Sequence, residues 1–549
     1  MPSAAKDHPV ELLSESLLSS DALELDRQNV ETHFGCSVKK ALQWSDSNYR
    51  PAENSPQPAS WLKSFADNLE NEQIPASLLQ VLDIAWNLFD LSNQHEAAAT
   101  CLFSICNLDR RSNGLVVDPV AEQMLEVELP LILAGHIKDE QRFDFLYTIA
   151  EEKLNHLISE LLDGDGWVHA KFCKQWLQMT ASWMRCLLLT DSFGAPILNE
   201  ESAEQFEWHV RQTLRILDGS RHSYFDSGQQ WCKSLITALV EYTADDEDQL
   251  IAQAFLPKVA RTSLDIDDPA SSISEWGEIG MLRSNWKKQS PRIAVTLHES
   301  QAAVSIGRER VWLTSELAPT IDLNGKPIQF DNSWEIVCWH SDDACDFLEM
   351  KCGTSDQSTQ GTLYRHLLLG HQDQFVFMGD VFRHESAERI DYRLTLNVTD
   401  DIECQQEPEN REIYLRSNNK LSAMVLPLNL NEWQQPSDPM NQFSLQDQKL
   451  TYCLSTVGTG IYSGLWIDLN SRRCCKPRTW RKLAVAESLR IVEDDEAVAF
   501  RIATGKEQWL IYRSLNPPVN RTFIGENHTC DFFAGKFSKG EVKEILTVE

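Results

Sequence analysis

The pattern of hydrophobic and polar positions changes once along the chain, near residue 270. Before this point apolar residues recur every three or four positions, as in Leu78, Leu82 and Trp86. This is the spacing of one buried helix face. Further helical runs are predicted at 94–107, 118–134, 138–162, 167–190, 201–217, 228–244 and 247–260.

Strict alternation of apolar and polar residues begins after Ser274, starting with Ile293, Val295 and Leu297. Such alternation is typical of strands that bury one face. Strand-like runs continue to the C-terminus with almost no helical periodicity. The pattern therefore predicts an α+β multidomain protein in which helices precede a large antiparallel β-sandwich.

A weak repeat organises the helical part. The pairs Leu108-Asp109, Leu162-Asp163 and Leu217-Asp218 each close a helical run, at intervals of about 54 residues. Asp-Gly follows in the last two copies, so Gly164 and Gly219 are predicted to be left-handed residues that stop a helix. Paired helices at a fixed period indicate a solenoid or an incomplete (α/α) toroid of helical hairpins.

These patterns predict three segments. Residues 1–58 are polar, Ser-rich and interrupted by Pro51, Pro56 and Pro58, so we expect a flexible N-terminal arm with a short amphipathic helix at Val10–Leu18. The helical-hairpin toroid domain is predicted over 59–270 and the β-sandwich domain over 271–549, with a further boundary near residue 410.

Composition narrows the classes of partner. The 549 residues carry a formal net charge of -32, which disfavours nucleic acid and anionic membrane surfaces. We find no secretory signal pattern and no apolar run long enough to span a membrane. Fourteen cysteines without secretion signals are typical of reduced thiols, so we expect a cytoplasmic protein. The oligomeric state is left open.

Candidate site residues follow the Asp-Gly pairs. Trp167, His169, His222 and Tyr224 come directly after the two predicted helix ends. In a toroid, one ring of loops faces a common groove, and these residues would lie on that ring. The alternative is that they are loop residues that pack on their neighbours.

The chain resembles the heparinase II/III-like group of polysaccharide lyases. The resemblance lies in the Asp-Gly pairs, in EIGMLRSNW at 278–286, in WEIVCWHSDDACDFLEM and in FVFMGDVFRHESAERIDYRLTL. It covers roughly residues 100–400. It implies β-elimination on uronate-containing saccharides, with an acidic oligosaccharide or polysaccharide as partner.

The resemblance also implies roles. Tyr224, His222 and His169 would be catalytic, because the charge that develops next to a uronate carboxylate needs a base and preplaced donors. Arg283 would bind the carboxylate through its fork, and Trp167 and Trp286 would bind sugar rings. No cofactor and no metal are implied.

The chain departs from the group's pattern after Trp286. The stretch TLHESQAAVSIGRERVWL contains His298 and Glu299 but no His-x-x-Asp motif, and the toroid is short. Both departures favour an alternative, a non-catalytic relative that uses the scaffold to bind carbohydrate or protein.

Three other groups of residues give weaker indications of a functional site. Cys338, Cys345 and Cys352 lie near His340, but the spacing predicts structural thiols, with Cys345 pointing away from His340. The basic cluster Arg472–Lys482 either receives an acidic sugar or partner, or pairs with nearby carboxylates. Neighbouring carboxylates offer a third function, glycoside hydrolysis; the candidates are Asp163 with Asp165 and Asp342 with Asp343. No phosphate-binding glycine motif occurs.

Overall fold

The computed structural model divides the chain into two compact units. Unit 1 comprises Met1–Leu217 and Arg221–Ser263, and unit 2 comprises Asp218–Ser220 and Leu264–Glu549. The residues that the structure describes are 27–34, 36–47, 49–50, 58–68, 75–88, 95–106, 118–137, 140–226, 228–253, 255–256, 266–299, 301–356, 360–434 and 440–549. Among the predictions, the helix at Val10–Leu18, the pair Leu108-Asp109 and the proline-rich stretch 51–57 lie outside them.

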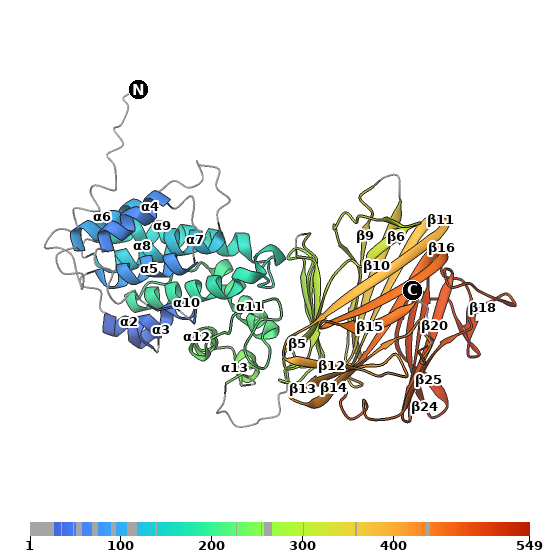
Figure 1. Cartoon of the computed structure of the whole chain (residues 1–549). Coiled ribbons are helices and arrows are strands. Elements are labelled where there is room, and N and C mark those ends of the chain that lie inside the picture. The colour runs from blue at the N-terminus through green and yellow to red at the C-terminus, as the bar shows by residue number, and fades with distance from the viewer. Residues whose placement is uncertain are drawn as a thin grey trace. The chain divides into compact units, whose positions relative to one another are not determined.

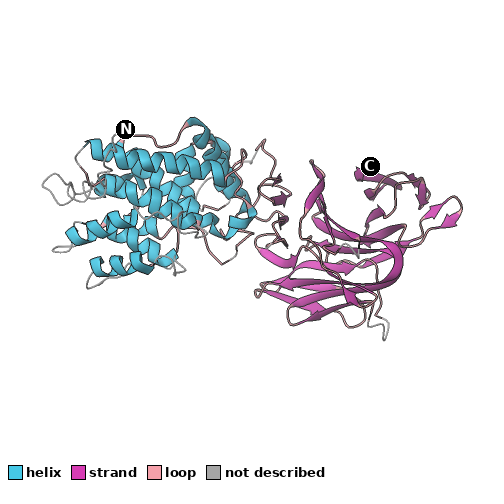
Figure 2. Cartoon of the chain, turned by 90° about the horizontal axis from the view of Figure 1, so that it is seen from above, coloured by secondary structure: helices cyan, strands magenta, loops and turns pink. Residues whose placement is uncertain are grey.

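Unit 1 is built from helices, and unit 2 is built from strands (Figures 1 and 2). The helices are α2 (Arg27–Phe34), α3 (Val38–Leu42), α4 (Pro58–Asn68), α5 (Pro75–Trp86), α6 (His95–Cys106), α7 (Pro119–Gln123), the π-helix η3 (Met124–Glu128), α8 (Leu129–Ala134), α9 (Glu140–Leu161), the 3-10 helix η4 (Ala170–Gln175), α10 (Trp176–Phe193), α11 (Glu200–Ile216), α12 (Lys233–Thr243) and α13 (Asp246–Ala252). The helices from α6 to α13 correspond to the predicted helical runs, whereas α2 and α3 lie in the predicted flexible arm. None of the described helices combines the length and the apolar character that a membrane crossing needs.

Local signals set the ends of these helices. The side chain of Asn199 accepts a hydrogen bond from the Ser202 N–H, and Glu200 and Glu201 occupy the first turn of α11, where a carboxylate suits the helix dipole. Gly194 ends α10 at φ 72°, a conformation that costs glycine little. Trp176 and Trp183 on α10 are buried, as their spacing of seven predicts.

Part of the predicted flexible arm is folded. Val30 and Phe34 on α2, and Trp44 just after α3, are all buried, and α2 packs against α10. The indole Nε1 of Trp44 donates to Ser234 Oγ at 2.9 Å. The prediction missed these helices because they are only eight and five residues long and their apolar residues are too few to show a period. Residues 1–26 lie outside the described range.

The repeated Leu-Asp pairs form two similar loops, but not through left-handed Gly164 and Gly219. Leu162 bridges Val168 after α9, and Leu217 bridges Ser223 after α11. The residues with positive φ are Gly166, at 77°, and Arg221, at 69°. The prediction for Gly164 and Gly219 is therefore wrong.

The aspartates shape these loops. Asp163 Oδ1 accepts hydrogen bonds from the N–H groups of Asp165 and Trp167, and Asp218 Oδ1 accepts one from Ser220. An aspartate that bonds to backbone N–H groups a few residues ahead stabilises a tight turn. The helical content of unit 1 agrees with the predicted class, and the closure of the hairpins into a toroid stays a prediction.

The large sheet of unit 2 runs in the order β1-β2-β3-β4-β5-β11-β16-β14-β13-β12, with further strands attached beside it. Its strands are β1 (Ser272–Ser274), β2 (Ile279–Arg283), β3 (Arg292–Thr296), β4 (Ala303–Gly307), β5 (Val311–Glu316), β6 (Thr320–Leu323), β7 (Lys326–Pro327), β8 (Glu335–Ser341), β9 (Cys345–Gly353), β10 (Gly361–Gly370), β11 (Phe375–Val398), β12 (Ile402–Gln406), β13 (Ile413–Ser417), β14 (Lys420–Pro427), β15 (Gln442–Gln446) and β16 (Lys449–Asp468). All pairings are antiparallel, as predicted.

Two smaller sheets follow. One has the order β17-β20-β21-β24-β25 and the other β19-β18-β22-β23. Their strands are β17 (Arg478–Leu483), β18 (Ala486–Glu487), β19 (Arg490–Ile491), β20 (Ala497–Thr504), β21 (Glu507–Ser514), β22 (Arg521–Phe523), β23 (Glu526–His528), β24 (Phe532–Ser538) and β25 (Glu541–Val548). The sheets therefore change after Asp468; β12 and β13, on either side of residue 410, belong to one sheet.

The paired strands β11 and β16 lie at the centre of unit 2. Val376 and Met378 on β11 belong to one hydrophobic core, and Phe375 and Phe377 belong to a second core that also contains Trp509 of the five-stranded sheet. Both faces of this part of β11 are thus covered, which explains its continuous apolar run.

Candidate functional site

The first group of predicted site residues lies on the loop after α9. Trp167 is 0% exposed, and its ring meets that of Trp176 edge-on at 5.9 Å. It is therefore a core residue and presents no face to a sugar, contrary to its predicted role. His169 is half-buried and caps η4, because its Nδ1 accepts the Lys171 N–H at 3.2 Å.

The second group lies on the loop after α11. Tyr224 is 2% exposed, and its N–H donates to Ile216 O at 3.0 Å. His222 is half-buried and forms a backbone bridge with Gln230. His222 and Tyr224 are thus two residues apart on a loop whose backbone is fixed by its contacts with Ile216 and Gln230. Their convergence with His169 stays a prediction.

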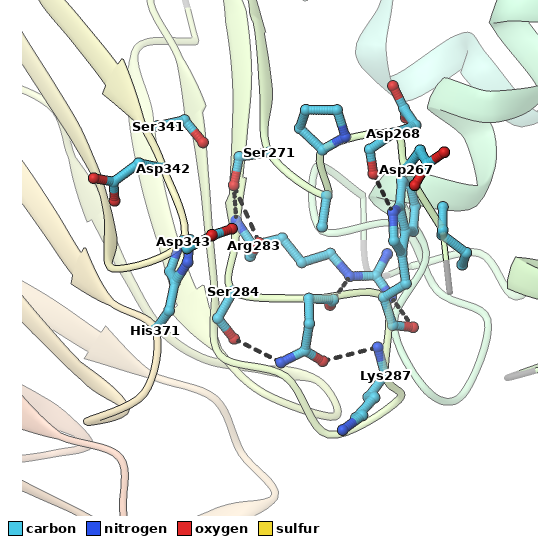
Figure 3. Close-up of a pocket in the computed structure, with 15 residues that line it drawn as sticks. Asp267, Asp268, Ser271, Arg283, Ser284, Lys287, Ser341, Asp342, Asp343 and His371 are labelled. Atoms are coloured by element: carbon cyan, nitrogen blue, oxygen red, sulfur yellow. Dashed lines mark hydrogen bonds between the residues drawn. The ribbon is translucent and has the colours of Figure 1, made fainter. Parts of the chain in front are cut away.

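The remaining two predicted residues, Arg283 and Trp286, line a cavity in unit 2 of about 350 Å³. Four segments form its wall: Ile266–Ser271, Arg283–Lys287 from the end of β2, Ser341–Asp343 from the end of β8, and His371 after β10. Figure 3 shows Asp342, Asp343 and His371 on one side, Asp267 and Asp268 on the other, and Arg283 between them.

Arg283 braces the wall instead of presenting an open fork. It is 1% exposed, and its Nε and Nη2 donate to the carbonyl oxygens of Asn285 and Trp286, each at 3.0 Å. Its guanidinium lies 4.9 Å from the centre of the Trp286 ring. The indole Nε1 of Trp286 in turn donates to Asp268 O at 2.9 Å. Both side chains hold the turn that shapes the cavity.

A buried carboxylate organises the opposite wall. Asp346 is 0% exposed, and it accepts hydrogen bonds from Ser271 Oγ at 2.6 Å and from Ser341 Oγ at 2.7 Å. His371 Nε2 lies 2.9 Å from Asp346 Oδ2. Because the serine hydroxyls and the imidazole surround this carboxylate, the wall is preorganised before any ligand binds.

The lining of the cavity is acidic. Asp267, Asp268, Asp342 and Asp343 outnumber the two cations that line it, the buried Arg283 and the exposed Lys287. Burial raises the pKa of Asp342, but the N–H groups of Cys345 and Ala344 and the His340 ring outweigh this and lower it. The cavity therefore suits hydroxyl groups or cations better than a uronate.

Sequence reasoning missed most of this cavity. Asp267 and Asp268 lie in the segment that the sequence pattern marks only as a domain boundary, and His371 follows a strand with no motif around it. The hydrolase candidates Asp342 and Asp343 line it, but they are neighbours on one turn. Asp163 and Asp165 likewise share one loop, so neither pair stands across a cavity.

One group of side chains could hold a metal within unit 2. A nitrogen of His340, an oxygen of Asp342 and the sulfur of Cys345 lie within 4.8 Å of one another. The prediction that Cys345 points away from His340 is therefore wrong, because the β8–β9 hairpin folds one over the other. Burial raises the pKa of the Cys345 thiol to about 12, and a thiol is a poorer ligand than the thiolate that zinc prefers.

Three of the six basic residues in the cluster at 472–482 form ion pairs within unit 2. Arg473 lies 2.6 Å from Asp468 Oδ2, Arg478 lies 3.0 Å from Glu412 Oε2, and Lys482 pairs with Asp494. Arg473 and Arg478 also lie over the rings of Trp509 and Tyr414. Of the two interpretations, the geometry favours pairing with the chain's own carboxylates.

Comparison with known proteins identifies the fold. No family model and no curated protein sequence matches this chain. The structure of a heparinase III matches with a TM-score of 0.58 at 10% identity, covering 92% of this chain and 95% of that chain. A mutant of the heparan sulfate lyase HepC from Pedobacter heparinus matches with a TM-score of 0.51 at 8% identity, covering 94% and 90%.

A heparinase III with methylated lysines gives a TM-score of 0.54 at 8% identity, covering 83% of this chain and 80% of that chain. The fold of this chain is therefore that of the heparinase III-like polysaccharide lyases. The predicted resemblance to the heparinase II/III-like group is confirmed at the level of the fold.

Proposed function

We propose that the chain is a carbohydrate-active protein that cleaves uronate-containing saccharides by β-elimination. The observation that supports this proposal is the fold, because the likeness to a heparinase III extends over 92% of this chain and 95% of that chain. Scaffold alone does not decide chemistry, so the proposal also rests on a tyrosine and two histidines at the loops after α9 and α11.

In the proposed reaction Tyr224, as phenolate, takes the proton from the carbon next to the uronate carboxylate. The C–O bond on the neighbouring carbon then breaks, a double bond forms in the uronate ring, and the leaving oxygen receives the proton back from the tyrosine. His222 and His169 would donate hydrogen bonds to the carboxylate, where negative charge develops. Arg283 has no part in this step, because its guanidinium braces the turn at 285–286.

The test is the ultraviolet absorbance of unsaturated uronate, with the full-length protein and a panel of uronate oligosaccharides and polysaccharides. We expect product from at least one substrate, and we expect Tyr224→Phe to lower kcat by roughly a hundredfold or more, the range expected of a lost acid–base group. Tyr242→Phe is the matched control, since Tyr242 lies on α12 of the same unit, and it should retain activity.

An alternative is supported by burial. Trp167 is fully buried and Tyr224 is 2% exposed, which suits a relative that keeps the scaffold to bind carbohydrate or protein without cleaving it. This alternative predicts no unsaturated product from any uronate substrate, together with saturable binding of a saccharide in calorimetry. Absence of both product and binding would argue against both functions.

A further inference from the structure

A second and larger hollow lies elsewhere on unit 2. This groove, of about 750 Å³, is bordered by the turn after β6, by Ser355, Asp356 and Gln360 between β9 and β10, and by the middle of β11. A volume of this size is within the range of ligand-binding clefts. None of the residues discussed above for elimination lines it.

An irregularity in β11 builds one wall of the groove. Arg383 pairs with Gly460 and Glu388 pairs with Gly458, so β11 gains extra residues between these points while β16 does not. The inserted stretch includes His384, Glu385 and Ser386, which line the groove. Bulges of this kind re-aim side chains and occur beside functional sites.

The opposite wall is fixed to this bulge. The Asn324 side chain accepts the Arg389 N–H at 3.2 Å and donates to Glu388 Oε2 at 3.0 Å, and its own N–H donates to Arg389 O at 2.9 Å. Asn324 and Gly325 both have positive φ, as a tight hairpin turn requires. These hydrogen bonds fix the positions of the two walls of the groove relative to each other.

The lining is rich in groups that bind hydroxyls. Gln329 and Gln360 each contribute an exposed amide, and Ser355, Ser386 and His384 lie alongside. An amide offers a donor and an acceptor in one plane, so it can bind two neighbouring hydroxyls of a sugar ring at once.

Charge selects among saccharides. Asp356, Glu385 and Glu388 face the groove with Lys326 as the cation among its lining residues. Carboxylates accept hydrogen bonds from hydroxyls but repel other carboxylates and sulfates, and the net charge of -32 adds to this repulsion. A neutral segment is therefore favoured over a polyanionic one.

We propose that this groove is a binding site for a neutral, hydroxyl-rich saccharide segment, held by the amides of Gln329 and Gln360 and by the β11 bulge. The site does not depend on the elimination chemistry proposed for unit 1.

The test is ligand-observed NMR and calorimetry on the full-length protein with neutral oligosaccharides of hexoses and, in parallel, uronate oligosaccharides of equal length. We expect at least one neutral oligosaccharide to bind, and we expect the uronates to displace it only weakly from the groove. Gln329→Ala and Gln360→Ala should each raise Kd by about three- to tenfold, which corresponds to one neutral hydrogen bond.

Gln446→Ala is the matched control, since Gln446 is an exposed residue of β15 in the same unit, and it should leave Kd unchanged. Tyr224→Phe should also leave this binding unchanged, which separates the groove from the elimination site. The proposal is overturned if no neutral saccharide binds, if uronates displace the neutral saccharide as well as the neutral saccharide itself does, or if the two glutamine variants bind like the control.

Discussion

At the scale of single residues, His209 on α11 shows how unit 1 holds a neutral imidazole in its core. The ring stacks on Trp176 at 5.4 Å and meets Trp183 edge-on at 5.2 Å. Its two nitrogens lie 2.8 Å from Thr180 Oγ1 and 3.1 Å from Gly166 O. Burial lowers its pKa to about 4, although the Gly166 carbonyl opposes this.

This depressed pKa predicts a loss of stability in acid. Below about pH 6.5 the unfolded chain binds a proton at this histidine that the folded chain rejects. Stability is therefore complete above about pH 6.5 and falls towards pH 4, by up to about 3 kcal/mol. Denaturant unfolding, followed by tryptophan fluorescence at several pH values, should show this decrease in unfolding free energy. The decrease should be smaller in His209→Gln.

His156→Gln is the control for this measurement, since the His156 side chain is 55% exposed and its removal should leave the slope intact. An equal slope in wild type and His209→Gln would show that other groups cause the acid sensitivity.

At the scale of elements, the loop between α9 and η4 depends on one glycine. Gly166 has φ of 77°, and a Cβ there would lie 2.2 Å from the His209 backbone nitrogen. Gly166→Ala should therefore destabilise unit 1 by about 3 kcal/mol, from the left-handed backbone and the clash together.

Gly164, two positions earlier on the same loop, is the matched control. A Cβ at Gly164 has nothing within 4 Å, so Gly164→Ala should change the unfolding free energy by less than about 0.5 kcal/mol. Urea unfolding compares the two variants. Equal losses of unfolding free energy in the two variants would show that the contact with His209 is not the cause of the destabilisation.

Elements were the most predictable part of this molecule. Helix spacing placed Trp176 and Trp183 in the core, and alternation placed Ile293 and Val295 in a buried strand. The site was less predictable, because the role of a side chain depends on which backbone atoms bond to it. The sequence does not show where those atoms lie. Arg283 has the residue type of a carboxylate binder, but two carbonyl oxygens of the next turn occupy its Nε and Nη2.

Long-range pairing escaped prediction for a related reason. His340 and Cys345 meet because a hairpin returns the chain after Asp342, and spacing along one strand says nothing about the next. Asp267 and Asp268 reach the wall of a cavity through the segment that precedes β1. Nothing in their local sequence distinguishes them from surface carboxylates.

At the scale of the whole molecule, the net charge of -32 sets how the protein responds to salt. Many like charges destabilise a compact state through repulsion, and salt screens them over about 8 to 10 Å at moderate ionic strength. Raising sodium chloride from about 0.02 M to about 0.2 M should therefore raise Tm by a few degrees. Differential scanning calorimetry at constant pH measures this, and a Tm that falls would show that ion pairs outweigh the repulsion.

The β11–β16 pair has a consequence for how this protein can be recombined. The two strands supply side chains to two of the hydrophobic cores of unit 2, and they pair from Phe375–Asp468 to Asn397–Lys449. A crossover between homologous genes that fell inside this span would join halves that had never packed together. Unit 2 is therefore expected to pass through shuffling as one module, with successful exchange points at its margins.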